Sequence, residues 1–155
     1  MDIELPLESL EEGSIVFCFE DIDAEPLPEE PLKAWLKAVA EAEGVPLLEL
    51  TYIFTSDEYL RRLNCEYLQH DYYTDVITFP YTSGYIHGDV FISLERVREN
   101  AQLYEVPFQQ ELCRVIVHGL LHLAGYTDDT DTERLIMQQK ENQYLMENPL
   151  LSTNI

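Results

Sequence analysis

The sequence predicts an α+β fold, a single domain in which a small four-stranded sheet packs with about five helices. Short apolar stretches typical of strands alternate with stretches in which apolar residues recur at helical spacing, and the helical stretches cluster late in the chain. The chain has 155 residues, 46% of them apolar, which is enough for one substantial core. We therefore expect residues 1–155 to form one domain, including the acidic N-terminal segment 1–30.

Three local patterns predict a first strand–helix–strand unit. Residues 14–20 have the apolar composition of a strand. From Leu32, apolar residues recur at helical spacing up to Gly44, which can end the helix. Trp35 belongs to this apolar stripe and is expected in the core. Residues 47–54 then predict a second strand.

The middle of the chain predicts a helix and a β-hairpin. Thr55 and Glu58 have the spacing of a capping box, which would start a helix that runs through Tyr67. Residues 76–81 and 86–92 are strand candidates separated by a Thr-Ser-Gly turn, so they can pair as a hairpin.

Capping residues and prolines predict the last three helices. Ser93 can cap a helix that ends before Pro107, and Pro107 suits the first turn of the long helix that follows. A final amphipathic helix can begin at Thr130 or Thr132 and end before Pro149.

The long helix carries the strongest functional signal, His118 and His122. Residues four apart on a helix are rotated by only about 40°, so both imidazoles project from one face and can bind one metal ion. Gly125 can end the helix, and the chain that turns there brings acidic residues back past the histidines: Asp128, Asp129 and Asp131. This pattern predicts a metal site at the C-terminal end of a central helix, with three protein ligands and one position open to water.

A second interpretation is a pair of core histidines that bind no metal and hydrogen-bond to backbone or carboxylate groups. Leu120, Leu121 and Leu123 indicate a buried helix, in which two unpaired imidazoles would be costly. Because a helix-ending glycine and an acidic turn follow at once, the pattern favours the metal site.

The net charge of −21 restricts any nucleic-acid partner, because a field of this sign repels phosphates. Residues 1–30 contain eleven acidic residues and no Lys or Arg, so about half of the excess charge lies in one segment. We interpret this segment as a solvated edge that keeps the protein soluble. The alternative is a docking surface for a basic partner protein.

Cysteine usage and apolar runs indicate the compartment. Cys18, Cys65 and Cys113 are odd in number and widely spaced, which favours neither a disulfide framework nor a thiolate metal site. The N-terminal residues lack the pattern of a secretion signal, and no apolar run approaches membrane-spanning length. We expect a cytoplasmic protein without a membrane partner.

Three motifs stand out in the sequence: residues 118–126 (HGLLHLAGY), 74–80 (TDVITFP) and 88–93 (GDVFIS), accompanied by Leu63-Asn64, Tyr67 and Asp71. Together they resemble one family, the YbeY metal-dependent endoribonucleases of bacteria. The resemblance covers close to half of the chain. It implies a Zn²⁺-dependent, single-strand-specific endoribonuclease in rRNA maturation, notably at the 3′ end of the small-subunit rRNA, and in ribosome quality control. The implied partners are single-stranded rRNA and the small ribosomal subunit with its proteins, and not DNA.

The chain departs from the family pattern H-G-x-x-H-x-x-G-Y-D-H at its third ligand. His118 and His122 match the two helical histidines, whereas Thr127-Asp128 replaces the final Asp-His. The resemblance therefore implies Asp128 as the third metal ligand, with Asp129 or the two histidines alone as alternatives. A carboxylate can bind Zn²⁺ but lowers the net charge at the ion, which opens the site to other divalent metals. Leu68 also stands where the family tends to have a basic residue, and this removes one expected RNA contact.

Arg114, four residues before His118 on the same helix face, is the candidate catalytic residue, because a guanidinium there could neutralise a phosphate. Its alternative role is an ion pair with Glu111 or another acid. Four upstream residues could line the same cleft: His70, Asp71, Thr74 and Asp75. Thr74 and Asp75 also suit a turn.

Gly119 occupies the place of the general-base glutamate in H-E-x-x-H zinc proteases and cannot transfer a proton, although it permits close packing. Two other functions stay open. One is a metallohydrolase of another substrate class, such as a peptide or amide. The other is a non-catalytic, ribosome-associated metal-binding protein.

Overall fold

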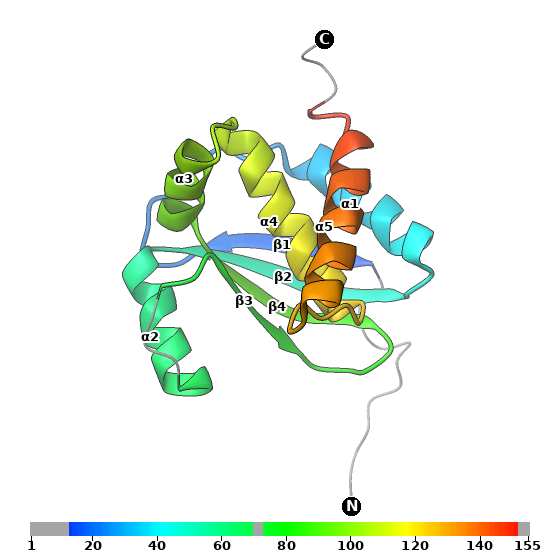
Figure 1. Ribbon diagram of the computed structural model, residues 1–155, viewed down its shortest axis with the longest axis horizontal. Helices are drawn as coiled ribbons and strands as arrows, with labels where there is room; N and C mark the ends of the chain where they lie inside the picture. The colour runs from blue at the N-terminus through cyan, green and yellow to red at the C-terminus, as the bar shows by residue number, and fades with distance from the viewer. Residues whose placement is uncertain (1–12, 70–72, 152–155) are drawn as a thin grey trace, which may run out of the picture.

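The computed structural model describes residues 13–69 and 73–151, which fold around one four-stranded sheet (Figure 1). The strand order is β1-β2-β4-β3, with β1 and β4 parallel to β2 and β3 antiparallel to β4. The strand bounds are β1 Ser14–Phe19, β2 Leu47–Thr55, β3 Val76–Pro80 and β4 Ile86–Ser93. The predicted α+β class and the predicted hairpin between the last two strands are confirmed.

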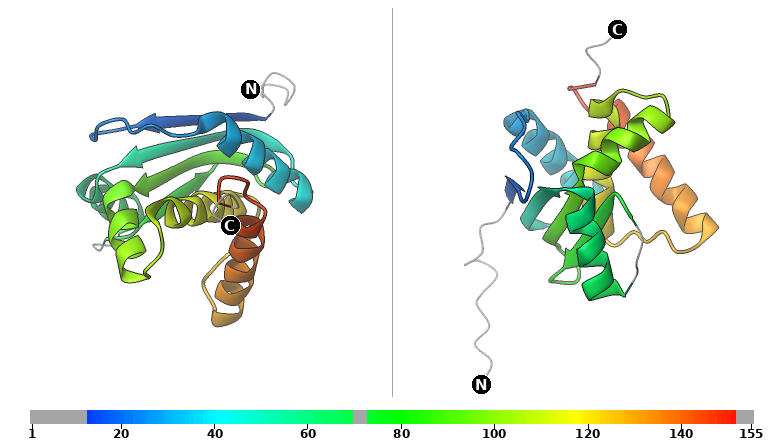
Figure 2. Two further views of the ribbon diagram at one scale, coloured as in Figure 1. Left: turned by 90° about the horizontal axis from the view of Figure 1, so that it is seen from above. Right: turned by 90° about the vertical axis from the view of Figure 1, so that its left-hand side faces the viewer.

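Five helices accompany the sheet in the described residues, as the sequence predicts. Their bounds are α1 Glu29–Glu43, α2 Asp57–Leu68, α3 Leu94–Leu103, α4 Phe108–Leu123 and α5 Asp131–Met146. Seen along the sheet, α4 lies against one face and α5 extends away from the sheet beyond it (Figure 2, left). None of the helices in the described ranges is long and apolar enough to cross a membrane.

Close packing between α4 and the sheet forms the centre of the core. The buried Tyr52 side chain on β2 donates a hydrogen bond to the Ile116 carbonyl of α4 at 2.7 Å. At Gly119, an added Cβ would lie only 2.6 Å from Val90 Cγ1 on β4. Gly119 therefore permits α4 to approach the sheet closely, in agreement with the close packing that the sequence suggested.

A buried hydrogen bond links α1 to α5 within the core. The indole Nε1 of Trp35 donates to the Tyr144 carbonyl at 3.0 Å, and both side chains are buried. The prediction that Trp35 belongs to the core is thereby confirmed. Helix α1 begins at Glu29, three residues before the predicted apolar stripe, and ends at Gly44 in the left-handed conformation.

One predicted helix cap is wrong. Ser56, not Thr55, caps α2, because its side chain accepts the Tyr59 amide at 3.1 Å. Thr55 is instead the last residue of β2, fully buried and paired with Ser93 in the sheet, so it cannot leave the strand to cap a helix. The capping box with Glu58 is therefore absent from the structure.

The other caps agree with the sequence, with one shift. Ser93 caps α3, and Thr130 rather than Thr132 caps α5 in a capping box with Glu133. Pro107 is the N-cap of α4, one residue before the predicted first turn. Residues 1–12 lie outside the described ranges, so their membership of the domain stays a prediction.

Candidate metal centre

The fold brings His118, His122 and Asp128 together at the C-terminal end of α4. The Nε2 atoms of His118 and His122 lie 3.6 and 3.5 Å from Asp128 Oδ2. One potential ligand atom from each residue falls within 4.8 Å of the others. In the part of the chain that the structure describes, this is the one group of three or more His, Cys, Asp or Glu side chains close enough to share an ion.

The turn after α4 determines which aspartate joins the histidines. Gly125 has a φ of +116°, which returns the chain toward the helix it has just left. Arg134 Nη1 then donates to the backbone carbonyls of Asp128 and Asp129 at 3.1 and 3.3 Å. The Asp128 side chain faces the histidines, whereas exposed Asp129 is outside the group. The geometry thus favours Asp128 over Asp129.

Glu141 on α5 orients the His118 ring, a contact that the sequence analysis missed. Its Oε2 lies 2.6 Å from His118 Nδ1, and the Glu141 side chain is only 7% exposed. A carboxylate at Nδ1 places the ring proton there and leaves the Nε2 lone pair directed at Asp128 and His122. Two imidazole nitrogens and one carboxylate with this outer support suit Zn²⁺ and related divalent ions.

Arg114 lies beside this pair and is held by acidic and amide groups. Its Nη1 donates to Glu141 Oε1 at 3.1 Å and to Asn142 Oδ1 at 3.2 Å. Its Nε lies 3.5 Å from Glu111 Oε1. The ion pair with Glu111, weighed as its alternative role, is therefore present, and the catalytic role stays a prediction.

The pKa values of the two histidines are shifted in opposite directions. Burial lowers the pKa of His118, but the hydrogen bond and charge of Glu141, with the charges of Asp75 and Asp128, raise it overall above the ordinary value. The pKa of His122 is lowered, mainly by burial and by the neighbouring His118. His122 is thus the more readily neutral of the two, as a metal ligand must be.

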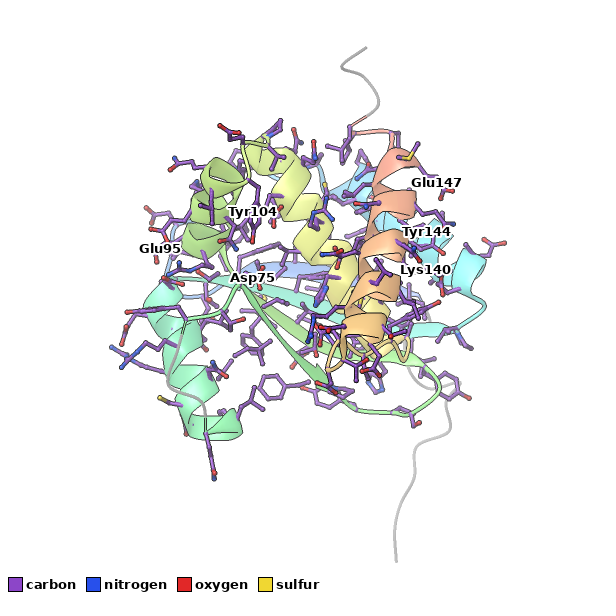
Figure 3. All side chains as sticks on the ribbon, viewed as in Figure 1. Asp75, Glu95, Tyr104, Lys140, Tyr144 and Glu147 are labelled. Atoms are coloured by element: carbon purple, nitrogen blue, oxygen red, sulfur yellow. The ribbon has the colours of Figure 1, made fainter. Side chains whose placement is uncertain are left out.

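A cleft of about 770 Å³ opens beside the three groups, between β3, α4 and α5. Thr74 and Asp75 line it, as the sequence predicts, and Figure 3 shows Asp75 where β3 begins, beside α4. His70 and Asp71 lie outside the described residues. The cleft therefore holds both histidines, Arg114 and Asp75 along one continuous surface.

Two cleft carboxyl groups have raised pKa values and could hold a proton. Burial raises the pKa of Glu111 to about 6, against the opposing charge of Arg114. Burial also raises the pKa of Asp75, although the charge of His118 lowers it in part. Carboxyl groups that are protonated closer to neutral pH are suited to donate a proton to a leaving group.

The sequence as a whole decides which family this site belongs to. Residues 13–148, and with them every element of the cleft, match the family described as Endoribonuclease YbeY. The chain belongs to this family. The resemblance that the sequence motifs indicate is thereby confirmed, and it extends well beyond the half of the chain that they cover.

Several YbeY proteins are similar over most of their length. The Endoribonuclease YbeY of Parabacteroides distasonis is 47% identical over 85% of this chain and 94% of its own. That of Cytophaga hutchinsonii is 46% identical over 88% of this chain and 96% of its own. The solution structure of a Thermotoga maritima protein superposes with a TM-score of 0.62 at 28% identity, over 85% of this chain and 87% of that one.

The third ligand of this YbeY-family chain can be assigned by metal binding. We expect Asp128→Asn to weaken Zn²⁺ binding by at least about tenfold, because an amide is a poorer donor than a carboxylate. Asp129→Asn removes the same charge from the adjacent residue and should leave the affinity nearly unchanged. Calorimetric titration of the metal-free protein measures both. The assignment is wrong if only Asp129→Asn loses the metal.

Proposed function

We propose that this chain is a Zn²⁺-dependent endoribonuclease that cuts single-stranded rRNA, with the 3′ end of the small-subunit rRNA as its substrate region. The observation that carries the proposal is the His118, His122 and Asp128 group inside a cleft of a YbeY-family fold. The relatives described above are named endoribonucleases, which supports the reaction class. Maturation and quality control of ribosomes in the cytoplasm would be its setting.

The charges in the cleft explain why such an acidic chain would need a metal to accept RNA. Among the described residues that line the cleft, four have acidic side chains, Asp75, Glu111, Asp128 and Glu141, whereas two are arginines, Arg114 and Arg134, beside the two histidines. A phosphate entering this cleft would be repelled. A divalent ion would offset the excess charge and supply a Lewis acid for the phosphodiester.

Four arginines outside the cleft pair with carboxylates and so offer RNA little free charge. Arg96 pairs with Asp57 at 2.6 Å, and Arg62 lies 3.5 Å from Glu58. Arg61 and Arg98 also pair with carboxylates, Glu58 and Glu25. RNA binding through the metal-bearing cleft is therefore favoured over binding through a basic surface.

Four cleft residues have distinct roles in the proposed reaction. Glu141 holds the His118 ring by its Nδ1 proton and at the same time holds Arg114. Arg114 is our candidate for neutralising a phosphate oxygen. Glu111 and Asp75 are the candidate proton donors for the leaving oxygen, because burial raises their pKa values.

The proposed function is tested with one oligonucleotide sequence in three forms. A fragment of the small-subunit rRNA 3′ end is offered single-stranded, annealed to its complement, and as DNA. We expect cleavage of the single-stranded RNA alone, loss of cleavage in EDTA and recovery with Zn²⁺. The measurement is the rate of product formation on a denaturing gel.

Other outcomes distinguish the alternative functions. Equal cleavage of the DNA form would contradict an RNA-specific enzyme. RNA binding without cleavage, by metal-loaded protein and also with small ribosomal subunits, would indicate the non-catalytic binding protein. Hydrolysis of a peptide substrate instead would identify a different metallohydrolase, although Gly119 provides no general base for it.

A further inference from the structure

A partly buried cluster around Glu43 joins the end of α1 to the turn after α4 and to α5. Glu43 is the last residue of α1, and its side chain is only 6% exposed. Its carboxylate accepts hydrogen bonds from Tyr126 Oη at 2.6 Å, from Lys140 Nζ at 3.1 Å and from Tyr144 Oη. These three donors come from the turn after α4 and from α5, so one carboxylate joins three separate segments.

A charged Glu43 carboxylate at the C-terminal end of α1 must be stabilised by hydrogen-bond donors. The C-terminal end of a helix carries a partial negative charge, which disfavours a carboxylate there. Burial raises the pKa of Glu43, but the hydrogen bonds from Tyr126, Tyr144 and Lys140 lower it overall. Glu43 is therefore a charged group held by its three donors.

Two of the three donors, Lys140 and Tyr126, also contact each other. Lys140 Nζ lies 5.8 Å from the centre of the Tyr126 ring, a cation–π contact. Figure 3 shows Lys140 and Tyr144 one turn apart on the side of α5 that faces α1. The phenol of Tyr126 is thus held by Glu43 at its hydroxyl and by Lys140 over its ring.

Tyr126 links this cluster to the metal ligands. It follows Gly125, whose φ of +116° begins the return of the chain, and it precedes Asp128 by two residues. Its backbone amide also donates to the carbonyl of Leu121, the residue before His122 on α4, at 3.0 Å. The far side of the turn is held separately, by Arg134 at the Asp128 carbonyl and by the capping box at Thr130.

We propose that Glu43 is a positioning residue, which acts through the Tyr126 hydroxyl to hold the turn between α4 and α5 so that Asp128 stays beside His118 and His122. The inference rests on the proposed metal site. Without the Glu43 contact, the Tyr126 hydroxyl no longer ties the turn to α1 and only the Lys140 contact with its ring remains, so the 38% exposed Asp128 side chain can move away from the histidines.

Two tyrosines that donate to the same carboxylate provide the matched test. Tyr126→Phe removes the hydroxyl from the turn, whereas Tyr144→Phe removes the hydroxyl from α5, at a residue that does not line the cleft. Co²⁺ serves as the probe ion, because its affinity and its visible absorption both report on the ligand set. Thermal unfolding of each variant measures the general loss of stability.

We expect Tyr126→Phe and Glu43→Gln to weaken Co²⁺ binding by about tenfold and to alter the Co²⁺ spectrum, as loss of an outer support does at other metal sites. Hydrogen exchange of the amides near Asp128 should also become faster. Tyr144→Phe should lower the melting temperature without changing the Co²⁺ affinity, the Co²⁺ spectrum or the hydrogen exchange near Asp128.

Three results would overturn the proposal. Unchanged Co²⁺ affinity in Tyr126→Phe would show that the turn needs no such anchor. Equal weakening in Tyr144→Phe would show that the cluster acts only through overall stability. Failure of the unaltered protein to bind Co²⁺ or Zn²⁺ would instead refute the metal site itself, and the positioning role with it.

Discussion

Replacing His118 with alanine is expected to remove both tight metal binding and RNA cleavage. His118 contributes one of only two imidazoles to the group, and its Nε2 lies 3.6 Å from Asp128 Oδ2. Loss of a direct ligand should weaken Zn²⁺ binding by more than the ~10- to 100-fold that loss of an outer hydrogen-bond partner causes. Calorimetric titration measures the affinity, and cleavage of the single-stranded rRNA fragment measures the activity.

His87→Ala is the matched control for this prediction. His87 lies on β4 and contacts Thr82 Oγ1 through its Nδ1 at 2.9 Å, and it is not among the residues that line the cleft. Its loss should leave metal affinity and cleavage close to those of the unaltered protein. Cleavage by folded His118→Ala at the unaltered rate would exclude this site as the catalytic centre.

Loss of metal binding in His118→Ala must be distinguished from loss of folding, because removal of the imidazole also affects Glu141. Without His118, the 7% exposed Glu141 carboxylate keeps Arg114 as its partner at 3.1 Å. A buried charge that retains one partner is less costly than an unpaired one. We therefore expect a folded protein with a lowered melting temperature, which circular dichroism verifies.

The candidate site was predictable wherever its signal is local. His118 and His122 are one helical turn apart, and Gly125 marks where the chain turns back. Because helix geometry is regular, the spacing of residues in the sequence determines where their side chains lie. The caps at Ser93 and Thr130 were predictable for the same reason.

The supporting residues were not predictable, because long-range packing brings them to the site. Glu141 is separated from His118 by 23 positions, and Glu43 from Tyr126 by 83. No periodicity relates residues on different helices, and both glutamates stand in sequences that suit exposed helix faces. Even the choice between Thr55 and Ser56 as helix cap depended on how far the sheet extends, a property of the paired strands.

The largest loss of stability is expected from Gly88→Ala, which places a methyl group against backbone. An ideal Cβ at Gly88 would lie 2.3 Å from the Phe79 carbonyl oxygen on β3 and 3.0 Å from Leu123 Cδ2 on α4. The carbonyl belongs to the strand paired with β4, so it can move only if β3 moves. We expect destabilisation of about 3 kcal/mol or more, at the upper end of overpacking effects. Chemical denaturation measures the change in unfolding free energy.

Gly119→Ala tests the same kind of close contact where the obstacle is a side chain. Its Cβ would lie 2.6 Å from Val90 Cγ1, and Val90 is fully buried. Overpacking of about 1–3 kcal/mol is offset in part by the roughly 1 kcal/mol advantage of alanine over glycine within a helix. We therefore expect a net loss smaller than that of Gly88→Ala.

The two clashes should differ in how far a second substitution relieves them. Val90→Ala removes both methyl groups that meet the new Cβ at position 119, so the double variant should lose less stability than the two single changes together, by about 1 kcal/mol. Leu123→Ala removes the 3.0 Å contact but leaves the closer Phe79 carbonyl in place, so it should relieve Gly88→Ala much less. Additive losses in the Gly119 and Val90 pair would contradict the close contact between α4 and β4. That contact holds the two histidine turns against the sheet, so its loss should also lower metal affinity.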